Sequence, residues 1–310
     1  MSKKILILGG FGFLGTTVSK EIKKDNDYEI FRESRRSGCD VLNYETLTKK
    51  IELISPDIII YCCANVGSIN YVSNYAAEVI NDNLQMCLNL YNAVSKINKN
   101  ILIINPLANC SYPGEIDIQN ESMWWEGRVH KSVESFGMYK KTSYIISECY
   151  KSQYGINTIN LMLGGGYGED DHIDEERTHA MNGIIMRMIK AKRNGDDEFV
   201  VWGTGKPIRE WVYMPDVAKI IKKVIDNNMI DIPNPLNIGQ CHGISILDIV
   251  NMVKKELNYD GKIVFDTNKQ DGAPIKVLGS ELFNKTFPGF TFTKYDEGIK
   301  NTINYYLKNI

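Results

Sequence analysis

Short apolar runs punctuate the first half of the chain, and each is followed by a longer segment with helical periodicity. Unbroken apolar runs of about four to eight residues are typical of strands that a sheet buries on both faces. The predicted strands lie at 5–8, 29–31, 56–61, 101–104 and 158–163, and the predicted helices lie near 16–24, 44–54, 72–97 and 132–154. This alternation predicts an α/β fold with a parallel, doubly wound sheet.

The second half mixes strands and helices in a less regular order. The predicted strands lie at 199–202, 236–238 and 262–265, and the predicted helices lie near 215–225, 245–257 and 295–308, with a further helix beginning at His179. We therefore expect a smaller, mixed α/β domain from this half of the chain.

The first apolar run ends in three glycines that are spaced three residues apart, Gly9, Gly12 and Gly15. Gly9 permits a tight turn, Gly12 lets the backbone approach a pyrophosphate, and Gly15 lets the next helix pack on the strand. Phe13 and Leu14 then open a helix whose free N–H groups and partial positive charge favour phosphate. This segment predicts a dinucleotide site.

Other residues of the first half complete the predicted cofactor site. Glu33 follows the second strand, where a carboxylate can accept hydrogen bonds from the adenosine ribose and repels a 2′-phosphate. Further residues expected at this site, beside strand ends, are Asp40, Val41, Ala64 and Asn65.

The overall composition is that of an ordinary globular protein. The chain has 310 residues, of which 43% are hydrophobic and 24% charged, and its formal net charge is −2. Charges of both signs are interspersed, so neither a nucleic acid nor an anionic membrane is expected as a partner. No apolar run approaches the roughly 18 residues of a membrane span, and the seven cysteines follow no disulfide framework, so we expect a cytoplasmic protein.

An acidic run at 169–176 invites comparison with a metal site, but consecutive carboxylates point in different directions and lack ligand spacing. We expect a solvated loop there and no metal.

The loop at 111–131 is long and carries Trp124 and Trp125. Loops of that length are often functional, and a packing role for the two tryptophans is an equal alternative.

Motifs along nearly the whole chain resemble those of the extended short-chain dehydrogenase/reductases, in particular the GDP-L-fucose synthase branch. The matching stretches are 64–69, 110–113, 153–155, 167–168, 178–179, 200–207 with Arg209 and Glu210, and 265–274. The resemblance implies a Rossmann-type dinucleotide-binding domain over 1–160, with a returning segment at about 205–238, and a nucleotide-sugar-binding domain over 161–310. It also implies a GDP-linked sugar substrate, a role in surface-polysaccharide synthesis and a homodimer paired through the helices near 72–97 and 132–154.

The resemblance also locates the catalytic positions of the family, and two of them have changed. The family pairs a tyrosine with a lysine four residues later, assisted by a serine or threonine at the end of the preceding strand. Lys140 matches the lysine, but Phe136 occupies the tyrosine position and Ala108 the hydroxyl position. The sequence leaves three alternatives open. The two changes are engineered substitutions, they arose by natural divergence, or Tyr139 acts as a substitute proton donor.

Other family positions are retained. Cys110 and His179 match the acid/base pair that epimerises carbons beside a C4 ketone. The 4,6-dehydratase reaction needs an Asp-Glu pair beside position 108, and the sequence has none there, so that reaction is not expected. Arg187 and Arg209 match diphosphate-binding arginines, a role that suits the guanidinium group. The substrate-binding residues that the resemblance implies are Asn109, Arg187, Trp202, Arg209, Lys269 and Asp271.

These motifs favour an NAD(H)-dependent oxidoreductase acting at C4 of a GDP-sugar, either a 4-keto reductase or an enzyme of the GDP-manno-heptose 4-dehydrogenase type. The alternatives are a C3/C5 epimerase that uses Cys110 and His179, and a catalytically silent NAD-binding subunit. Relatives that use NADP carry an arginine inside the glycine loop, where this chain has Phe11. NAD(H) is therefore favoured, while Arg32, Arg35 and Arg36 leave NADP(H) open.

Overall fold

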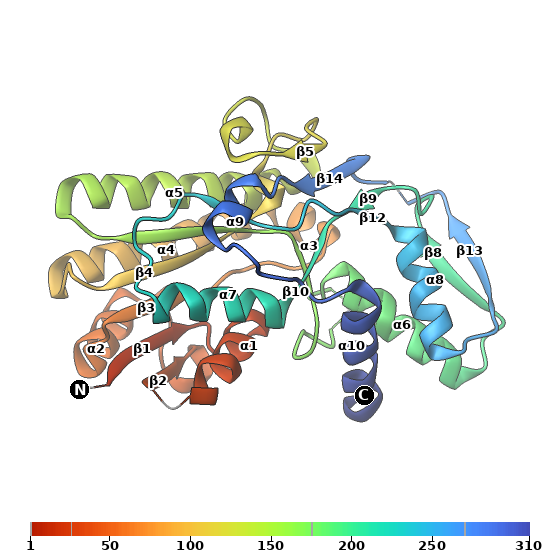
Figure 1. Ribbon diagram of the computed structural model, residues 1–310, viewed down its shortest axis with the longest axis horizontal. Helices are drawn as coiled ribbons and strands as arrows, with labels where there is room; N and C mark the ends of the chain where they lie inside the picture. The colour runs from red at the N-terminus through yellow and green to blue at the C-terminus, as the bar shows by residue number, and fades with distance from the viewer. Residues whose placement is uncertain (1, 26, 175, 270) are drawn as a thin grey trace.

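Five strands from the first part of the chain and one from the second form a six-stranded parallel sheet in the order β11-β6-β4-β3-β1-β2. The computed structural model describes residues 2–25, 27–174, 176–269 and 271–310 (Figure 1). The strands are β1 (Lys3–Leu8), β2 (Tyr28–Glu33), β3 (Ile58–Tyr61), β4 (Leu102–Ala108), β6 (Thr158–Leu163) and β11 (Leu236–Ile238). The predicted Rossmann-type doubly wound sheet is confirmed.

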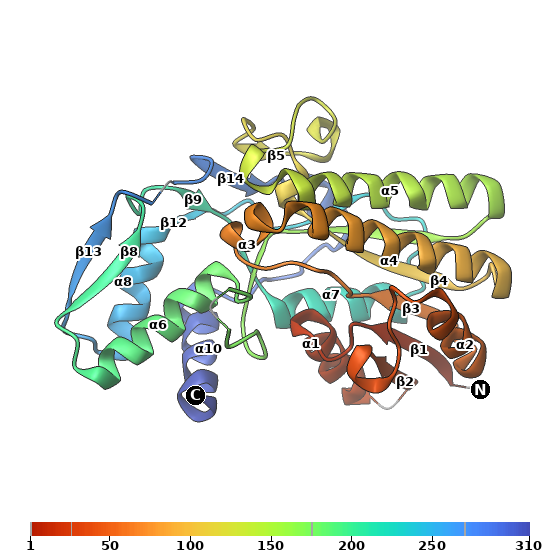
Figure 2. The ribbon, with the colours of Figure 1, turned by 180° about the vertical axis from the view of Figure 1, so that it is seen from behind.

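Helices cover both faces of this sheet. One face carries α1 (Phe13–Ile22) and α7 (Met214–Asp226), with the short helix α9 (Glu281–Thr286) beside β11. The opposite face carries α2 (Tyr44–Ile54), α4 (Ala76–Ile97) and α5 (Glu134–Tyr154), and α4 and α5 lie side by side (Figure 2). Segments near both ends of the chain therefore contribute to one layered structure.

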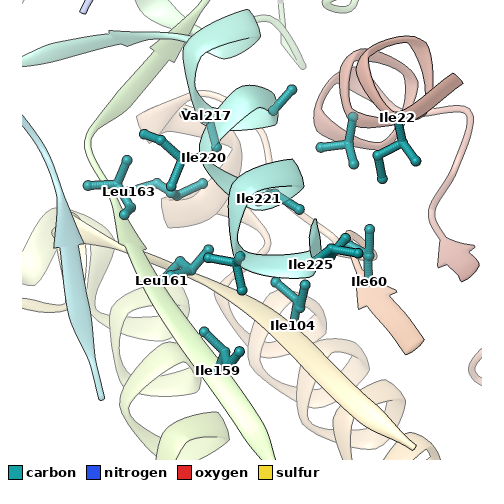
Figure 3. Packing of buried hydrophobic residues seen from close by; sticks show 14 of the residues in the cluster. Ile22, Ile60, Ile104, Ile159, Leu161, Leu163, Val217, Ile220, Ile221 and Ile225 are labelled. Carbon is teal, nitrogen blue, oxygen red and sulfur yellow. The ribbon is translucent and has the colours of Figure 1, made fainter. Parts of the chain in front are cut away.

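The apolar run in β1 explains why the sheet is buried on both sides. Successive side chains of a strand point to opposite faces. Ile5 and Ile7 pack in the cluster beneath α1 and α7, whereas Leu6 and Leu8 pack in the cluster beneath α2 and α4, and none of the four is exposed. Figure 3 shows the first of these clusters, in which Ile225 of α7 lies near the central strands.

Some predicted boundaries shift for local reasons. The predicted helix at 72–97 is interrupted at Tyr75, whose non-helical ψ of 37° separates α3 (Ile69–Asn74) from α4. β4 continues to Ala108 through Pro106 because β6 pairs with it to that residue, whereas β3 pairs with it only as far as Ile104. The missing N–H of a proline is tolerated where a neighbouring strand is absent.

The remaining residues form a second lobe with its own core. Three helices, α6 (Ala180–Asn194), α8 (Ile246–Leu257) and α10 (Tyr295–Asn309), pack with the parallel pair β8 (Glu198–Trp202) and β13 (Lys262–Asp266). Between the lobes lie short strands: β7 (Gly165–Tyr167) pairs with β10 (Trp211–Tyr213), and β12 (Ile244–Ser245), β9 (Ile208–Arg209), β14 (Ile275–Leu278) and β5 (Ile118–Gln119) form a four-stranded sheet. Within the described residues, no helix is long and apolar enough to cross a membrane.

Two buried polar side chains hold β14 in place between the lobes. The carboxylate of Glu210 accepts hydrogen bonds from the backbone N–H groups of Gln240 and Leu278. Asn237, at the centre of β11, donates its side-chain amide to the carbonyl groups of Gln119 and Gly279, at 2.7 and 3.1 Å. Buried polar groups that find such partners fix the relative position of the strands that carry them.

The packing of α7 on the sheet makes a prediction about stability. Ile221 is fully buried between α7 and the sheet, so Ile221→Ala leaves a cavity, and we expect it to lower the free energy of unfolding by about 2–5 kcal/mol. The matched control is Leu53→Ala on α2, where 79% of the side chain is exposed and we expect a change within about 0.5 kcal/mol. Denaturant titration followed by circular dichroism measures both, and equal effects would contradict this packing.

Candidate active site

The glycine loop after β1 is shaped by contacts that admit no side chain. Gly9 has a φ of +75°, and a Cβ atom there would lie 2.7 Å from the carbonyl carbon of Cys62. A Cβ atom on Gly15 would collide with the carbonyl oxygen of Gly9. The N–H groups of Gly9 and Gly10 both donate to the carbonyl oxygen of Glu33, at 2.9 and 3.1 Å. These contacts fix where α1 begins relative to the ends of β1 and β2.

The loop has the features that a dinucleotide pyrophosphate requires. Gly12 caps the N-terminus of α1, and a Cβ atom there would meet only the carbonyl oxygen of Gly9, at 3.4 Å. The first N–H groups of a helix, here those of Phe13 and Leu14, have no carbonyl partner inside the helix and attract phosphate. The residues present therefore fit the phosphates of a nicotinamide dinucleotide.

The adenosine end of the predicted cofactor site contains charges of both signs. The Glu33 carboxylate accepts a hydrogen bond from Ser37, at 2.6 Å, and pairs with Lys50, at 3.0 Å. Arg32 donates to the carbonyl oxygen of Gly10, at 2.6 Å, and its guanidinium lies 4.4 Å from the ring centre of Phe11. Arg32 is thus held against the glycine loop, while the carboxylate of the next residue, Glu33, contacts Ser37 and Lys50.

The other predicted cofactor residues lie at the same edge of the sheet. Asp40 accepts a hydrogen bond from the N–H of Leu42, and the carbonyl oxygen of Val41 accepts one from Asn89. Ala64 and Asn65 follow β3. Ala64 is exposed, and Asn65 is held by hydrogen bonds with Tyr71, Asp82 and Asn83.

The structure brings together the three positions at which the family places its hydride-transfer groups. Lys140 on α5 is buried and donates to the carbonyl oxygen of Pro106 in β4, at 2.7 Å. Its ammonium group lies 5.4 Å from the ring centre of Phe136, and Ala108 ends β4. Burial lowers the pKa of Lys140 to about 8. The hydroxyl of Ser111 is occupied, because it donates to the carbonyl oxygen of Ala108.

Tyr139 does not supply the missing phenol. Its side chain is fully buried in the core beneath α2 and α4, with Tyr61 and Cys87 in the same cluster. Burial holds the pKa of Tyr139 well above its usual range, and the Tyr61 hydroxyl is its polar neighbour. The alternative in which Tyr139 serves as the proton donor therefore requires its hydroxyl to leave this core.

Cys110 lies in the short turn at 109–111 that follows β4, where the charges of two lysines act on its thiol. Burial raises the pKa of the Cys110 thiol, while the charges of Lys276 and Lys140 act in the opposite direction. Lys276 belongs to β14, where it is paired in register with Arg209 of β9. The sequence motifs do not include Lys276. Its position in a short strand, distant along the chain from Cys110, gave no signal.

His179 precedes α6 and is held by a carboxylate that the sequence did not identify. Its Nδ1 atom lies 3.1 Å from both oxygens of Asp171. The Asp171 side chain has no exposed surface, so the expected solvated loop at 169–176 is wrong at this residue. Of the same run, Glu175 lies outside the described residues. Burial alone would lower the pKa of His179, but the charge and hydrogen bond of Asp171 outweigh it and raise that pKa.

The predicted substrate residues lie in several places, and the structure brings only some of them together. The guanidinium of Arg187 lies 4.8 Å from the ring centre of Trp202, and the ammonium of Lys269 lies 5.9 Å from the same ring. Arg209 lies in β9 beside Lys276, and Asn109 immediately precedes Cys110. Asp271 instead closes a turn by accepting hydrogen bonds from the N–H and hydroxyl of Thr204, and Gln270 of the same motif lies outside the described residues.

The two tryptophans of the long loop differ in their environments. Trp124 is fully buried and donates its ring N–H to the hydroxyl of Ser111, at 2.9 Å. Trp125 is 51% exposed, and its ring centre lies 4.9 Å from that of Trp124. The packing interpretation therefore applies to Trp124, whose hydrogen bond to Ser111 holds the segment that carries Cys110.

Comparison with known proteins agrees with this geometry. The profile of the NAD dependent epimerase/dehydratase family matches residues 5–239. GDP-L-fucose synthase from Dictyostelium discoideum is 28% identical over 317 residues, covering 99% of this chain and 96% of its own length. GDP-L-colitose synthase from Yersinia pseudotuberculosis is 29% identical over 310 residues, covering 98% of each chain.

A solved structure shows the same fold over the whole chain. The crystal structure of a GDP-L-fucose synthetase from Naegleria fowleri superposes with a TM-score of 0.88 at 25% identity, covering 99% of this chain and 94% of the other. The resemblance found in the sequence motifs is thereby confirmed. The chain belongs to the NAD dependent epimerase/dehydratase family, as a GDP-L-fucose synthase-like extended short-chain dehydrogenase/reductase.

Proposed function

We propose that this enzyme epimerises a ring carbon beside the C4 ketone of a GDP-linked sugar. The observation that carries the proposal is a contrast between two sets of groups. The proton-transfer pair is retained and electrostatically supported, with cations near Cys110 and a carboxylate on His179. The hydroxyl groups that assist hydride transfer are replaced by Phe136 and Ala108, and the neighbouring Tyr139 is in the core.

The proposed reaction moves one proton off the sugar and another on. A hydrogen on a carbon beside a ketone is acidic because the electron pair left behind is shared with the carbonyl oxygen. The Cys110 thiolate takes the proton, the pair moves to the C4 oxygen as an enolate, and the His179 imidazolium returns a proton to the opposite face. Exchange with water restores the thiolate and the imidazolium, so nothing is oxidised or reduced.

The charged groups around the proposed site suit this chemistry. The charges of Lys276 and Lys140 act to lower the pKa of the Cys110 thiol, which burial raises, and an ammonium group in a buried site also favours negative charge on a nearby oxygen. Arg187, Trp202 and Arg209 are proposed to hold the guanosine diphosphate part of the substrate, since guanidinium groups bind phosphate in pairs of hydrogen bonds. The names of the relatives, GDP-L-fucose synthase and GDP-L-colitose synthase, support a GDP-linked sugar.

We propose NAD(H) as the preferred dinucleotide, on the strength of Glu33 and of Phe11 within the glycine loop. A nicotinamide dinucleotide exchanges a hydride with the C4 position of a sugar when it is bound. In this chain Lys140 is retained to hold the dinucleotide ribose, but no phenol stands at position 136 to pass a proton to or from the C4 oxygen. Hydride transfer is therefore proposed to be slow relative to proton exchange.

The second candidate is a C4 oxidoreductase, as a 4-keto reductase or a GDP-manno-heptose 4-dehydrogenase. The intact glycine loop and the buried Lys140, whose pKa is about 8, are the observations that favour it. In that case Lys140 itself would have to exchange the proton that the tyrosine exchanges elsewhere in the family.

Deuterium uptake tests the epimerase proposal. In D2O with a GDP-4-keto-6-deoxy-mannose substrate, we expect mass spectrometry to show solvent deuterium entering the sugar ring. Cys110→Ser and His179→Gln should each slow this uptake by about 10²- to 10⁴-fold, the usual contribution of one general acid or base. Cys149→Ser, at an exposed cysteine on α5, is the control and should leave the rate unchanged. Absence of uptake by the wild-type enzyme would refute the proposal.

Restoring the hydroxyl groups separates the two candidates. We expect the double variant Phe136→Tyr with Ala108→Ser to gain NADH oxidation with the same substrate by about 10²-fold or more, because both proton transfer and charge stabilisation return. Tyr139→Phe should leave all activities unchanged, since its hydroxyl is in the core. Rapid NADH oxidation by the wild-type enzyme, followed at 340 nm as roughly one NADH per sugar, would instead favour the oxidoreductase.

The glycine loop predicts how the dinucleotide binds. Gly12→Ala adds a methyl group where the backbone approaches the pyrophosphate, and we expect it to weaken NAD binding by about tenfold or more in calorimetric titration. The added Cβ atom has only one neighbour, at 3.4 Å, so the melting temperature without NAD should change little. Unchanged NAD affinity in the variant would contradict the proposed binding mode.

A further inference from the structure

Asp171 is the centre of a buried hydrogen-bond network at the start of α6. Its two oxygens accept from Nδ1 of His179 at 3.1 Å and from the backbone N–H of the same residue at 2.9 Å. They also accept from the amide of Asn182 at 2.9 Å, the hydroxyl of Thr178 at 3.2 Å and the N–H of His172 at 2.9 Å. The side chain has no exposed surface.

A buried carboxylate is costly unless donors and a positive charge compensate it. Four of these five donors are neutral, and the imidazole of His179 is the one that can carry a positive charge. Burial alone would raise the pKa of Asp171, but His179 and the N–H donors outweigh it and lower that pKa. Asp171 is therefore ionised at neutral pH, and its charge acts directly on the imidazole.

The contact also determines which nitrogen of His179 is available. A carboxylate at Nδ1 accepts the proton on that atom, so Nε2 is left to exchange a proton with another molecule. The imidazole is partly exposed, with 41% of the side-chain surface accessible, whereas its carboxylate partner is enclosed. On the other side, the ring centre of Phe13, the first residue of α1, lies 5.3 Å from that of His179.

We propose that Asp171 is a positioning residue for proton transfer: it fixes the imidazole of His179 with Nε2 free and holds it in the protonated form that donates to the substrate. This inference rests on the proposed epimerase function and adds to it a residue that the sequence motifs did not identify. A purely structural role for Asp171, capping the start of α6, is the alternative that the test must exclude.

Four further charged or titratable groups lie near this network, and the three charged ones have partners of their own. They are Asp170, which pairs with Lys20 of α1 and accepts from Tyr305 of α10; Glu169, which accepts from Tyr213; Tyr306 of α10, beside Asp171; and Arg177, whose guanidinium lies over the ring of Tyr71. Phe13 presents only an apolar ring to the imidazole. Asp171 is thus the acidic group in contact with His179 among the residues that the structure describes.

The test compares Asp171→Asn with the neighbouring variant Asp170→Asn, which removes the same charge one residue away. Titration of the histidine rings by NMR, with His179 assigned through His179→Gln, should show the midpoint of His179 moving to lower pH in Asp171→Asn and staying in place in Asp170→Asn. Because the proposed donor is the protonated ring, deuterium uptake by Asp171→Asn should fall about tenfold or more at neutral pH. The rate of deuterium uptake by Asp171→Asn should also begin to fall at a lower pH than the rate of the wild-type enzyme.

An unchanged His179 midpoint in a folded Asp171→Asn variant would overturn the inference and leave only the capping role. The wild-type titration decides the matter even if that variant does not fold, because a His179 midpoint at or below the ordinary value of about 6.5 would also overturn it. Failure of the proposed function looks different: the wild-type enzyme would take up no deuterium, whatever the midpoint of His179.

Discussion

The contact between Gly9 and Gly15 is the constraint on which the rest of the site depends. Because no side chain fits between the end of β1 and the first turn of α1, the helix begins directly over the sheet edge. That position places Phe13 at the proposed pyrophosphate site and also against the ring of His179 in the second lobe. One close approach of backbone therefore connects the dinucleotide loop with a proposed proton donor.

The electrostatics on the two sides of the proposed site are opposite in sign. Near Cys110 the neighbouring charges are those of Lys276 and Lys140, which act to lower the pKa of a thiol whose pKa burial raises. Near His179 the neighbouring charge is that of Asp171, which favours an imidazolium. Neighbouring charges of opposite sign are a common means of giving two groups different proton affinities. At the positions to which the resemblance assigns hydride transfer, Phe136 and Ala108 carry no titratable group and Lys140 carries one.

The sequence predicted the parts of the molecule that have strong local patterns. The strand Thr158–Leu163 and the helix Tyr44–Ile54 were found with their observed bounds, because long apolar runs and regular periodicity identify them. Short strands such as β5 and β9, two residues each, have too little periodicity to be recognised, and their partners are distant along the chain. Lys276 was missed because its strand β14, of four residues, is also short and pairs with these distant strands.

Asp171 was missed for a different reason, since the acidic run around it is typical of a solvated loop. Its burial depends on Asn182 and Thr178, whose side chains meet it only after α6 has packed. The motif positions Cys110, Lys140 and His179 were recognised from the sequence, but their electrostatic partners came from elements that local patterns do not connect.

The most direct test of the central claim is the structure of the product after a single turnover. With a 4-keto GDP-sugar labelled with ¹³C and an excess of enzyme and NADH, we expect NMR to show an intact C4 ketone and an inverted configuration at C3 or C5. A C4 alcohol with the original configuration at both neighbouring carbons, formed with one equivalent of NAD, would contradict the account.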